Sequence, residues 1–450
     1  MTRTWDRLTL PGKALFILIP LLAVLTLGLV ITLALFGQQI LDILVFNLPI
    51  VRFVFAVTVL MLIFVPMAFV IIYMEMKIIA LMNLRMGPDR VGPWGTLLST
   101  IHGLKVLMKE DFTPSGADAV VFTWAPVVVF STAVLSAMVL PFAPGLYGQD
   151  FNIGLLYFFA VGGMTVVGLL MGGWSSFNKY SLIGGIRSAA QIVSYEIPLT
   201  LSVVGLVILA GTMSLNTIVE QQGLSGWATD WYAFRQPLGF LIFAIAATAE
   251  ANRTPFDLTE ADSEIVAGFA TEYSGMRFGF FFFAEYINVF IISAITVVLF
   301  LGGWNAPFPV PHIAWELNPG TLGIGLLLLL AIVPVVATLV FALPFYLFRS
   351  KTRWWVALIL GFVMFNVVAG GLLSLWAYIN FDWVAGLFWF TAKAFGLVFL
   401  FVWMRGTLPR VRIDQLMGFA WKWLLPAALV NLFVTALAVM VIDVLNGGAA

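Results

Sequence analysis

The sequence contains no cysteine and only two histidines, His102 and His312, which lie far apart in the chain. Without cysteine the chain forms no disulfide and offers no thiolate to an iron–sulfur cluster. Two isolated histidines also argue against a haem or a histidine-rich metal site. If the protein takes part in redox chemistry, another component must hold the electrons.

Charged residues are scarce as well. They make up 10% of the 450 residues, whereas hydrophobic residues make up 62%. A soluble domain of this composition could not cover itself with polar surface, so the composition predicts an integral membrane protein with many helices. Lys and Arg balance Asp and Glu, 22 against 22, so the net charge argues neither for nor against a nucleic-acid partner.

Uncharged or nearly uncharged runs predict eleven membrane-spanning helices. They lie at roughly 14–36, 53–74, 120–142, 153–174, 191–212, 236–252, 278–301, 321–347, 354–379, 385–404 and 423–442. The first run is longer than the apolar region of a signal peptide, about 7–15 residues, so we expect it to be retained. With the N-terminus inside, 19 of the 22 Lys and Arg residues fall on inside segments. This bias predicts a cytoplasmic N-terminus and a periplasmic C-terminus.

One of the inside segments is acidic. The stretch EANRTPFDLTEADSE, residues 250–264, leads into a loop at 253–277 that contains Asp257, Glu260, Asp262, Glu264 and Glu272. A solvated loop is the ordinary interpretation of such a charge run. Apolar residues are interleaved with the acids, however, and neighbouring carboxyls repel one another, which favours protonation of some of them near neutral pH. The pattern therefore also suits a proton relay.

Four charged residues lie within predicted spans: Glu196, Glu250, Glu285 and Lys393. A charge at the bilayer centre costs about 2.5–3.5 kcal/mol on insertion scales, so each must be paired or used. The uncharged stretch before Glu250 has only fourteen residues, about 21 Å of helix against a hydrocarbon core of about 30 Å. Single ion pairs or snorkelling end groups would explain each residue separately. A row of carboxyls running from the acidic loop into the membrane would explain the three glutamates together.

A second inside loop contains LRMGPDRVGPWG, residues 84–95, in which Arg85 and Arg90 each precede a turn-forming Gly-Pro pair. The two arginines either anchor the loop at the membrane or bind carboxylates of a partner or of the acidic loop. The next segment predicts an amphipathic helix in the membrane interface, with an apolar face formed by Leu97, Ile101, Leu104 and Met108. This helix could wall the mouth of a cavity for an amphipathic ligand, with His102 as a proton donor, although a surface histidine without a role fits the sequence at least as well.

The sequence shows no nucleophilic triad, glycine-rich phosphate loop or metal-spaced cluster, so we expect no covalent catalysis, redox centre or metal site in this chain. Several longer segments, however, are together similar to one family. They are MGPDRVGPWG, GLKVLMKEDFTP, GGWSSFNKYSLIGGIRSAAQIVSYE, NRTPFDLTEADSE, GFATEYSGMRFG, AEYINV, LFLGGW and RVRIDQLM. They resemble the quinone-binding membrane subunits of respiratory complex I, which include subunit 1 of the mitochondrial enzyme. The resemblance runs from Val51 to Asp443 and is interrupted at 305–384.

The resemblance implies an all-α integral membrane protein with an eight-helix core. An extra transmembrane helix and a periplasmic linker would occupy 1–50, and an inserted helical hairpin would occupy 305–384. Core helices would lie at 51–304, together with the arginine and amphipathic loop (75–118) and the acidic loop (253–277). The last two core helices would lie at 385–450.

The implied function is that of a membrane subunit of a proton-translocating NADH-quinone oxidoreductase in the bacterial cytoplasmic (inner) membrane. The chain would help to form the quinone chamber and the carboxylate path that couples quinone reduction to proton translocation. The chamber and its entrance would involve Glu75, Arg85, Arg90, His102, Lys105 and Arg253. The proton path would involve Glu196, Glu250, Asp257, Glu260, Asp262, Glu264, Glu272, Glu285 and Lys393.

The resemblance also implies partners. Ubiquinone or menaquinone would be the substrate, while NADH, FMN and iron–sulfur clusters would be bound by partner subunits. We expect contacts with the hydrophilic-arm subunits that carry the terminal iron–sulfur cluster and the quinone site, with neighbouring membrane-arm subunits and with membrane lipid, but not with nucleic acid. An equivalent subunit of a membrane-bound hydrogenase, or of a relative with another electron donor, is an alternative. A proton or ion transporter is disfavoured because the sequence shows no inverted repeat with paired broken helices.

Four positions depart from the family pattern. The family's PFDLPEAE appears as PFDLTEAD, so that Thr259 replaces a proline and Asp262 a glutamate. His102 stands where many members have Asp, and Gly163 stands where some members have a glutamate of the proton path. The resemblance therefore predicts that one carboxyl of the path is missing from this chain.

Overall fold

The computed structural model describes residues 49–224, 226–257, 267–308 and 382–445. The helices expected at 14–36, 321–347 and 354–379 lie outside the described residues, as do Glu260, Asp262 and Glu264. In the described ranges every regular element is a helix, apart from one isolated bridge between Ala143 and Leu146. The expected all-α class is confirmed.

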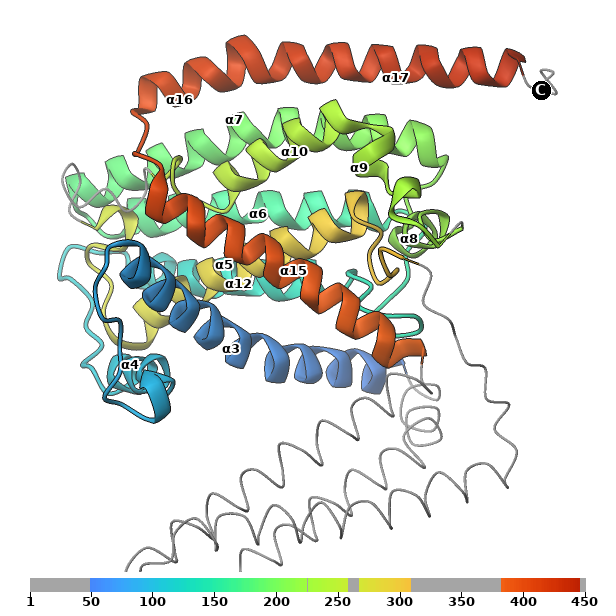
Figure 1. Cartoon of the computed structure of the whole chain (residues 1–450). Coiled ribbons are helices and arrows are strands. Elements are labelled where there is room, and N and C mark those ends of the chain that lie inside the picture. Colours follow the sequence, from blue (N-terminus) through green and yellow to red (C-terminus); the bar gives the residue numbers. More distant parts are fainter. Residues whose placement is uncertain (1–48, 225, 258–266, 309–381, 446–450) are drawn as a thin grey trace, which may run out of the picture. The chain divides into compact units, whose positions relative to one another are not determined.

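Every predicted span within the described residues corresponds to a helix (Figure 1). These helices are α3 (Pro49–Met82), α5 (Ala119–Ala137), α6 (Gly154–Ser175), α7 (Lys179–Ala210), α10 (Pro237–Glu250), α12 (Gly275–Phe300), α15 (Asp382–Thr407) and α17 (Leu425–Leu445). Six segments of the described chain are long and apolar enough to cross a membrane, and α10 is a shorter apolar helix. In the last of the six, Ile413–Ile442, a π-helical turn joins α16 (Ile413–Phe419) to α17.

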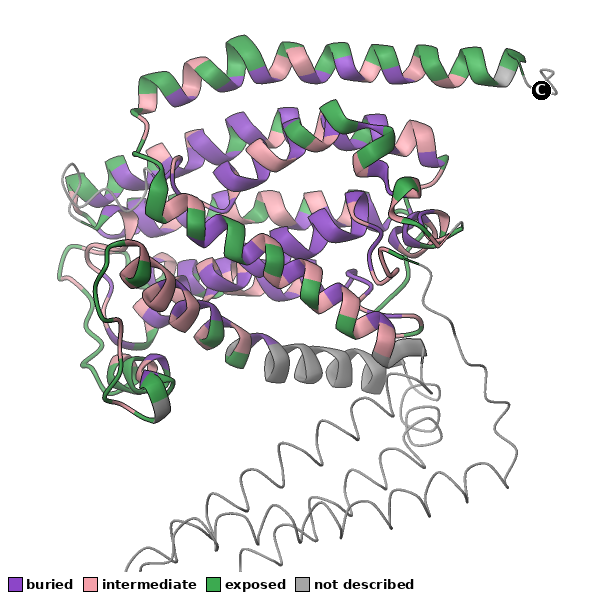
Figure 2. Cartoon of the chain, viewed as in Figure 1, coloured by how far each residue is buried: buried purple, intermediate pink, exposed green. Residues whose placement is uncertain are grey.

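The helices from residue 63 onward belong to one compact unit. In it, α6 packs against both α5 and α7, and α7 also contacts α10 and α17. The helix α12 contacts α5 and α15, and every residue from Val289 to Phe300 is buried (Figure 2). Burial of this stretch leaves no hydroxyl unpaired, because Ser293 and Thr296 donate to carbonyls of their own helix at 2.8 and 2.6 Å. The outward side of α17 is exposed and apolar, as expected for a surface that lipid covers (Figure 2).

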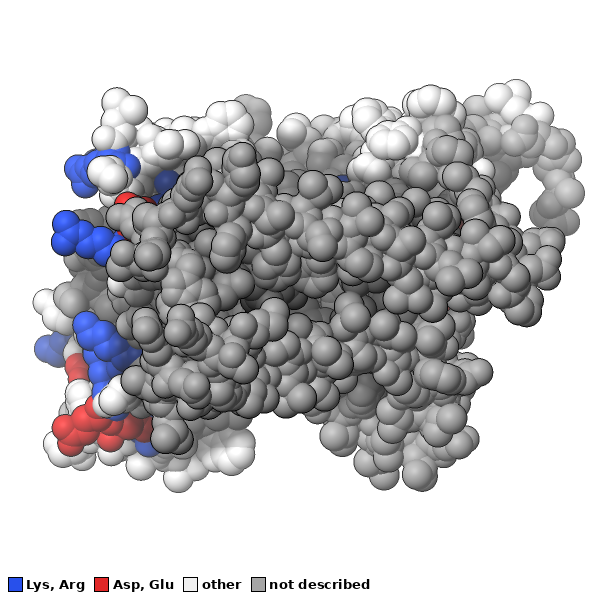
Figure 3. All heavy atoms as spheres, turned by 60° about the horizontal axis from the view of Figure 1, so that its bottom comes forward, with Lys and Arg blue, Asp and Glu red and all other residues white. Residues whose placement is uncertain are grey.

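The connecting segments lie at two ends of this unit. We call the segments at 83–118, 176–178, 251–257, 267–274 and 408–412 the charged end, and those at 138–153, 211–236 and 301–308 the opposite end. Figure 3 shows that the Lys, Arg, Asp and Glu side chains visible in that view gather at one end of the molecule. Helices α5, α7 and α12 begin at the charged end, whereas α6, α10 and α15 end there. This alternation of direction is the one expected of a multi-span membrane protein.

Capping residues start two of these helices at the charged end. The Asp118 carboxylate accepts the amide N–H of Val120 at 3.2 Å, and the Asn178 side chain accepts that of Tyr180 at 2.9 Å. At the opposite end α7 stops at Gly211, whose φ of 66° is a left-handed conformation that glycine adopts without strain.

The short helix α4 (Leu98–Leu107) lies at the charged end and is the predicted amphipathic helix. Its apolar residues Leu97, Ile101, Leu104 and Met108 are exposed, at 45% to 87% of their surface. The side turned toward the core has the small residues Ser99 and Gly103, which allow close approach to α3 and α12. The exposed apolar face therefore needs lipid or a partner to cover it.

Candidate functional site

A buried ion cluster joins four distant parts of the chain at the charged end. The Arg253 guanidinium, in the turn after α10, donates from Nη1 to Glu75 Oε2 of α3 at 3.3 Å. Its Nη2 lies 3.5 Å from Glu285 Oε1 of α12. Arg405, near the end of α15, also donates to the Glu75 carboxylate. Glu75 and Arg253 are only 7% and 4% exposed, and the charges persist in this dry position because each has a partner of opposite sign.

The turn that presents Arg253 is held by a buried glutamine. Gln191 of α7 donates from Nε2 toward the carbonyl of Ala249 at 2.8 Å and that of Phe256 at 2.7 Å. Asn252, between them, has a φ of 50°, so the chain reverses sharply directly after α10. Arg253 also lies over the ring of Tyr286, 4.5 Å from its centroid. The position of the guanidinium is therefore fixed from α7, α10 and α12 together.

Other contacts tie the acidic loop to its neighbours. Asp257 pairs with Arg410 at 2.9 Å, and Glu272 accepts a hydrogen bond from Asn178 Nδ2 at 2.6 Å. Next to Glu272, Tyr273 stacks on Phe122 with centroids 4.0 Å apart and donates to its carbonyl at 3.2 Å. Burial raises the pKa of the Tyr273 hydroxyl, which keeps the proton on this donor. Both described ends of the loop are thus packed against the helices.

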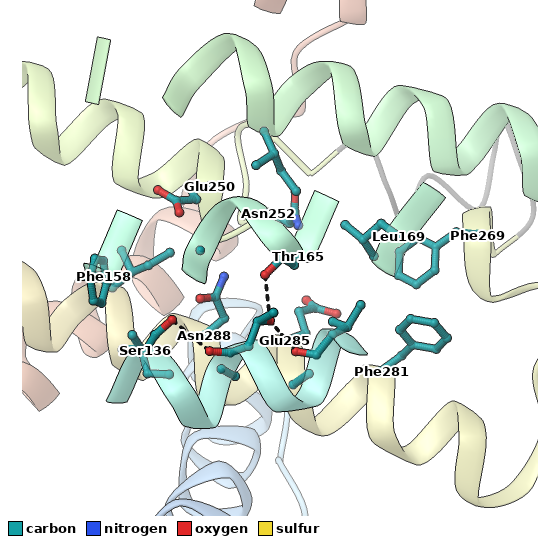
Figure 4. A pocket seen from close by; sticks show the side chains of 18 residues that line it. Ser136, Phe158, Thr165, Leu169, Glu250, Asn252, Phe269, Phe281, Glu285 and Asn288 are labelled. Carbon is teal, nitrogen blue, oxygen red and sulfur yellow. Dashed lines mark hydrogen bonds between the residues drawn. The ribbon is translucent and has the colours of Figure 1, made fainter. Parts of the chain in front are cut away.

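A polar cavity lies between α5, α6, α10 and α12, next to the ion cluster (Figure 4). Its volume is about 60 Å³, room for a few waters at about 10–15 Å³ each. Polar side chains line it alongside apolar ones; they are Thr132, Ser136, Thr165, Glu250, Asn252, Glu285 and Asn288. Figure 4 shows Glu250 above the hollow and Asn288 and Ser136 below it. The cavity meets the two conditions for holding water, space and several hydrogen-bonding partners.

A larger cavity of about 280 Å³ lies beneath α4, between α3 and α12. Its lining is mainly apolar and includes Phe69 and Phe283, whose rings meet edge to face at 5.1 Å. His102, Lys105 and Lys109 of the α4 segment also line it. An apolar hollow with a few hydrogen-bond donors at its edge suits an amphipathic molecule.

Most of the site residues that the sequence predicts, where the structure describes them, lie in the ion cluster, in the contacts of the acidic loop or in one of the two cavities. Glu75, Arg253 and Glu285 form the ion cluster, Glu250 and Glu285 line the polar cavity, and His102 and Lys105 line the apolar cavity. Four others lie apart. Glu196 of α7 is half-buried beside Gly163 of α6. Arg85 and Arg90 are exposed on the loop before α4, and Lys393 donates to the carbonyls of Leu301 and Asn305 at the opposite end, both at 2.7 Å.

Sequence reasoning missed Arg405, Gln191 and Asn288. In the sequence, Arg405 contributes only to the positive-inside bias. That bias does not indicate that the side chain of a basic residue faces the interior of the protein. Asn288 carries the same signal as Glu285, a polar residue three positions later in the same apolar span, and could have been found by extending the search from charged to amide side chains.

Comparison with known proteins gives consistent results. The sequence profile described as NADH dehydrogenase matches residues 54–436. The chain is 43% identical over 364 residues to a subunit of the NADH-quinone oxidoreductase of Anoxybacillus flavithermus, covering 81% of this chain and 86% of that protein. It is 41% identical over 388 residues to the corresponding subunit of Bacillus cytotoxicus, covering 86% and 94% of the two chains. The corresponding subunit of Dehalococcoides mccartyi is 41% identical over 378 residues, with 84% of each chain covered.

Proposed function

Because this chain belongs to the NADH dehydrogenase family, as a membrane subunit of the proton-translocating NADH-quinone oxidoreductase, we propose that its apolar cavity admits the quinone and its buried carboxyls carry the coupled protons. The chain itself supplies no redox centre in this proposal. The quinone would receive its electrons from an iron–sulfur cluster of a hydrophilic-arm subunit, which would bind at the charged end. The names of the relatives favour this complex over a hydrogenase or a separate transporter.

The apolar cavity suits the quinone for two reasons. Its aromatic lining favours an isoprenoid tail, and it lies beneath α4, whose exposed apolar residues would rest on the bilayer from which a lipid-soluble molecule arrives. His102 and Lys105 offer N–H donors for the quinone carbonyls at the edge of the cavity. Arg85 and Arg90, on the preceding loop, would frame the entrance together with the partner subunits. Ubiquinone and menaquinone both satisfy this chemistry.

One observation carries the proton proposal: Glu285 belongs both to the ion cluster and to the polar cavity. Arg253 is shared between Glu75 and Glu285, so any change of charge near Glu75 alters how strongly Arg253 holds the Glu285 carboxylate. Quinone reduction takes up electrons and protons and would change that balance. Glu285 could then exchange a proton with water in the cavity and, through it, with Glu250 on the other side.

The remaining carboxyls extend this route in the proposal. Asp257, Glu260, Asp262, Glu264 and Glu272 belong to the acidic loop and would connect the hydrophilic arm to the cluster. Glu196 would follow Glu250 within the helices, and Lys393 would be the cation at the far end of the route. With the charged end facing the cytoplasm, the N-terminus is cytoplasmic and the C-terminus periplasmic in the bacterial inner membrane.

The test replaces Glu250 or Glu285 with Gln in the assembled complex. We expect NADH-driven quinone reduction and the coupled acidification of inverted membrane vesicles to fall together, by roughly a hundredfold, because glutamine cannot carry the proton. The matched control is Glu220→Gln, at an exposed position of α8 (Leu215–Gln221) at the opposite end, which should leave both rates unchanged. Normal turnover and normal acidification in an assembled Glu285→Gln complex would refute the proposed path.

A further inference from the structure

The hydroxyls that line the polar cavity direct their hydrogens away from it. The Thr132 hydroxyl donates to the carbonyl of Val129 at 2.7 Å, and the Ser136 hydroxyl donates to that of Thr132 at 2.8 Å. Because Thr132 has no second hydrogen, Thr165 must be the donor in the 2.9 Å contact between the two threonine hydroxyls. All three hydroxyls therefore present only lone pairs to the cavity.

The two carboxyls of the cavity differ in their partners. Glu285 has the guanidinium of Arg253 at 3.5 Å. Glu250 also lines the cavity, but its carboxyl forms no hydrogen bond or ion pair with the residues that the structure describes. A carboxylate away from bulk water is costly unless it accepts hydrogen bonds. The ionised form of Glu250 therefore needs a donor, and the hydroxyls of the lining do not provide one.

The side-chain amide of Asn252 has an orientation that its neighbours determine. Gln191 Nε2 faces the carbonyls of Ala249 and Phe256 at 2.8 and 2.7 Å, and because carbonyls only accept, the nitrogen of this amide must lie on their side. The same nitrogen lies 3.2 Å from Asn252 Oδ1. A reversed Asn252 amide would bring two N–H groups against each other. Its oxygen therefore faces Gln191, and its Nδ2 points the other way.

The other side of Asn252 is the polar cavity. Asn252 lines that cavity, and Figure 4 shows the nitrogen of its side chain directed toward the hollow. Its backbone φ of 50° is a left-handed conformation that asparagine adopts more readily than most residues. Asn288 lines the cavity as well, but its amide forms no hydrogen bond with a described residue that would fix its direction.

We propose that Asn252 donates from Nδ2 to the ionised carboxylate of Glu250, directly or through a water in the polar cavity, and that Gln191 is the positioning residue that sets this direction. The backbone carbonyls fix the Gln191 amide, which fixes the Asn252 amide, which presents its N–H groups to the cavity. Asn252 thereby stabilises the state in which Glu250 has released its proton. The inference rests on the proposed function, because it deepens the role of Glu250 in the carboxyl path.

The test replaces Asn252 with glycine, which tolerates the left-handed backbone and removes the amide. In the assembled complex we expect Asn252→Gly to lower NADH-driven quinone reduction and acidification by roughly tenfold, the size expected for losing one hydrogen bond to a charged group. The KM for quinone should be unchanged, because the apolar cavity is not altered. The matched control is Asn152→Gly, the same change at an exposed position of the opposite end, which should leave both rates unchanged.

Infrared difference spectra of the complex separate a hydrogen-bond donor from a residue that only shapes the turn. The carboxylate bands of Glu250 are those that disappear in Glu250→Gln. In Asn252→Gly these bands should shift, because the carboxylate loses an N–H partner. Unshifted bands would overturn the proposal, as would full activity of the variant. If Asn252→Gly does not assemble, the nearly isosteric Asn252→Asp replaces the donor by an acceptor, and normal turnover in that variant would be equally fatal.

A double variant tests the part of Gln191. Gln191→Met removes the donor that holds the Asn252 amide, so turnover should fall several-fold while the KM for quinone stays unchanged. If Gln191 acts through Asn252, the same change should have a smaller effect in the Asn252→Gly background. Losses that multiply fully in Gln191→Met/Asn252→Gly would show two independent effects and would overturn the positioning role.

The same set of variants distinguishes this inference from the proposed function. If Glu250→Gln abolishes turnover while Asn252→Gly does not lower it, Glu250 works without this donor and only the role of Asn252 is wrong. If Glu250→Gln leaves turnover intact, the carboxyl path itself is wrong.

Discussion

The Arg253 guanidinium has more carboxylates around it than one positive charge can neutralise. It lies 3.3 Å from Glu75 and 3.5 Å from Glu285, and Arg405 supplies the second positive charge on the side of Glu75. Among the residues that the structure describes, the cluster contains two arginines and two glutamates. The two arginines do not have the same contacts: Arg405 donates to Glu75, whereas the guanidinium beside Glu285 is that of Arg253.

This arrangement predicts unequal effects of removing charges. Arg253→Met leaves Glu285 without this guanidinium in a largely buried place and should destabilise the chain by about 3–5 kcal/mol. The double variant Arg253→Met/Glu285→Gln removes one charge of each sign and leaves Glu75 with Arg405, so it should recover part of the loss. Thermal unfolding of the detergent-purified complex measures both. A double variant less stable than the single one would contradict this account of the cluster.

At the level of single residues, the sequence allows glutamates within apolar spans to be identified, but not the residues that contact them. Glu196, Glu250 and Glu285 can be identified because a carboxyl in an apolar span has few explanations. Arg405 cannot, since a basic residue near the inside end of a span already satisfies the positive-inside bias. Which side of a helix faces the core depends on tertiary packing, and no local pattern in α15 indicates it.

Among the elements, α4 shows the clearest division of faces. Ile101 and Leu104 are exposed, while Gly103 and Val106 line the apolar cavity, where Gly103 lies against Phe69 and Phe283. A Cβ at Gly103 would meet Phe69 Cε1 at 2.7 Å, so any side chain there must displace an aromatic ring.

Gly103→Val should therefore narrow the apolar cavity and raise the KM for quinone by roughly tenfold, as a ligand pocket loses space to the new methyl groups. The exposed residue Thr100 of the same helix provides the control, Thr100→Val, which should leave the KM unchanged. Steady-state kinetics with a soluble short-tail quinone gives the comparison. An unchanged KM in an assembled Gly103→Val complex would remove the cavity from the quinone route.

Element boundaries are predicted well where helices are apolar and less well where they are polar. The span expected at 191–212 belongs to α7, which begins twelve residues earlier at Lys179. Its first turns contain Lys179 and Arg187, so a search for uncharged runs excludes them, although small residues such as Gly184 and Gly185 pack closely against neighbouring backbone. In the same way α3 continues past the expected end at 74 because Glu75 and Lys77 are inside the helix.

For the whole molecule, orientation in the membrane is the property from which the direction of proton movement follows. The absence of cysteine makes this measurable, because a single introduced thiol is the only one in the chain. Leu224→Cys, at the opposite end, and Met86→Cys, at the charged end, place thiols at side chains that are 82% and 90% exposed.

With the proposed orientation, a membrane-impermeant maleimide should label Leu224→Cys and not Met86→Cys when it is added on the periplasmic side of sealed spheroplasts. Inverted vesicles should give the reverse result, with the cysteine-free chain as the blank. Labelling of Met86→Cys from the periplasmic side would reverse the assignment of both ends.

The contacts of α15 have a consequence for how chain length can vary in this protein. Lys393 fixes the helix to the carbonyls of Leu301 and Asn305, Arg405 fixes its other end to Glu75, and the ring of Phe308 meets that of Trp389 at 5.3 Å. Described residues on both sides of 309–381 thus hold α15 against α12 and α3. We therefore expect these contacts to persist in relatives whose chains differ in length between α12 and α15.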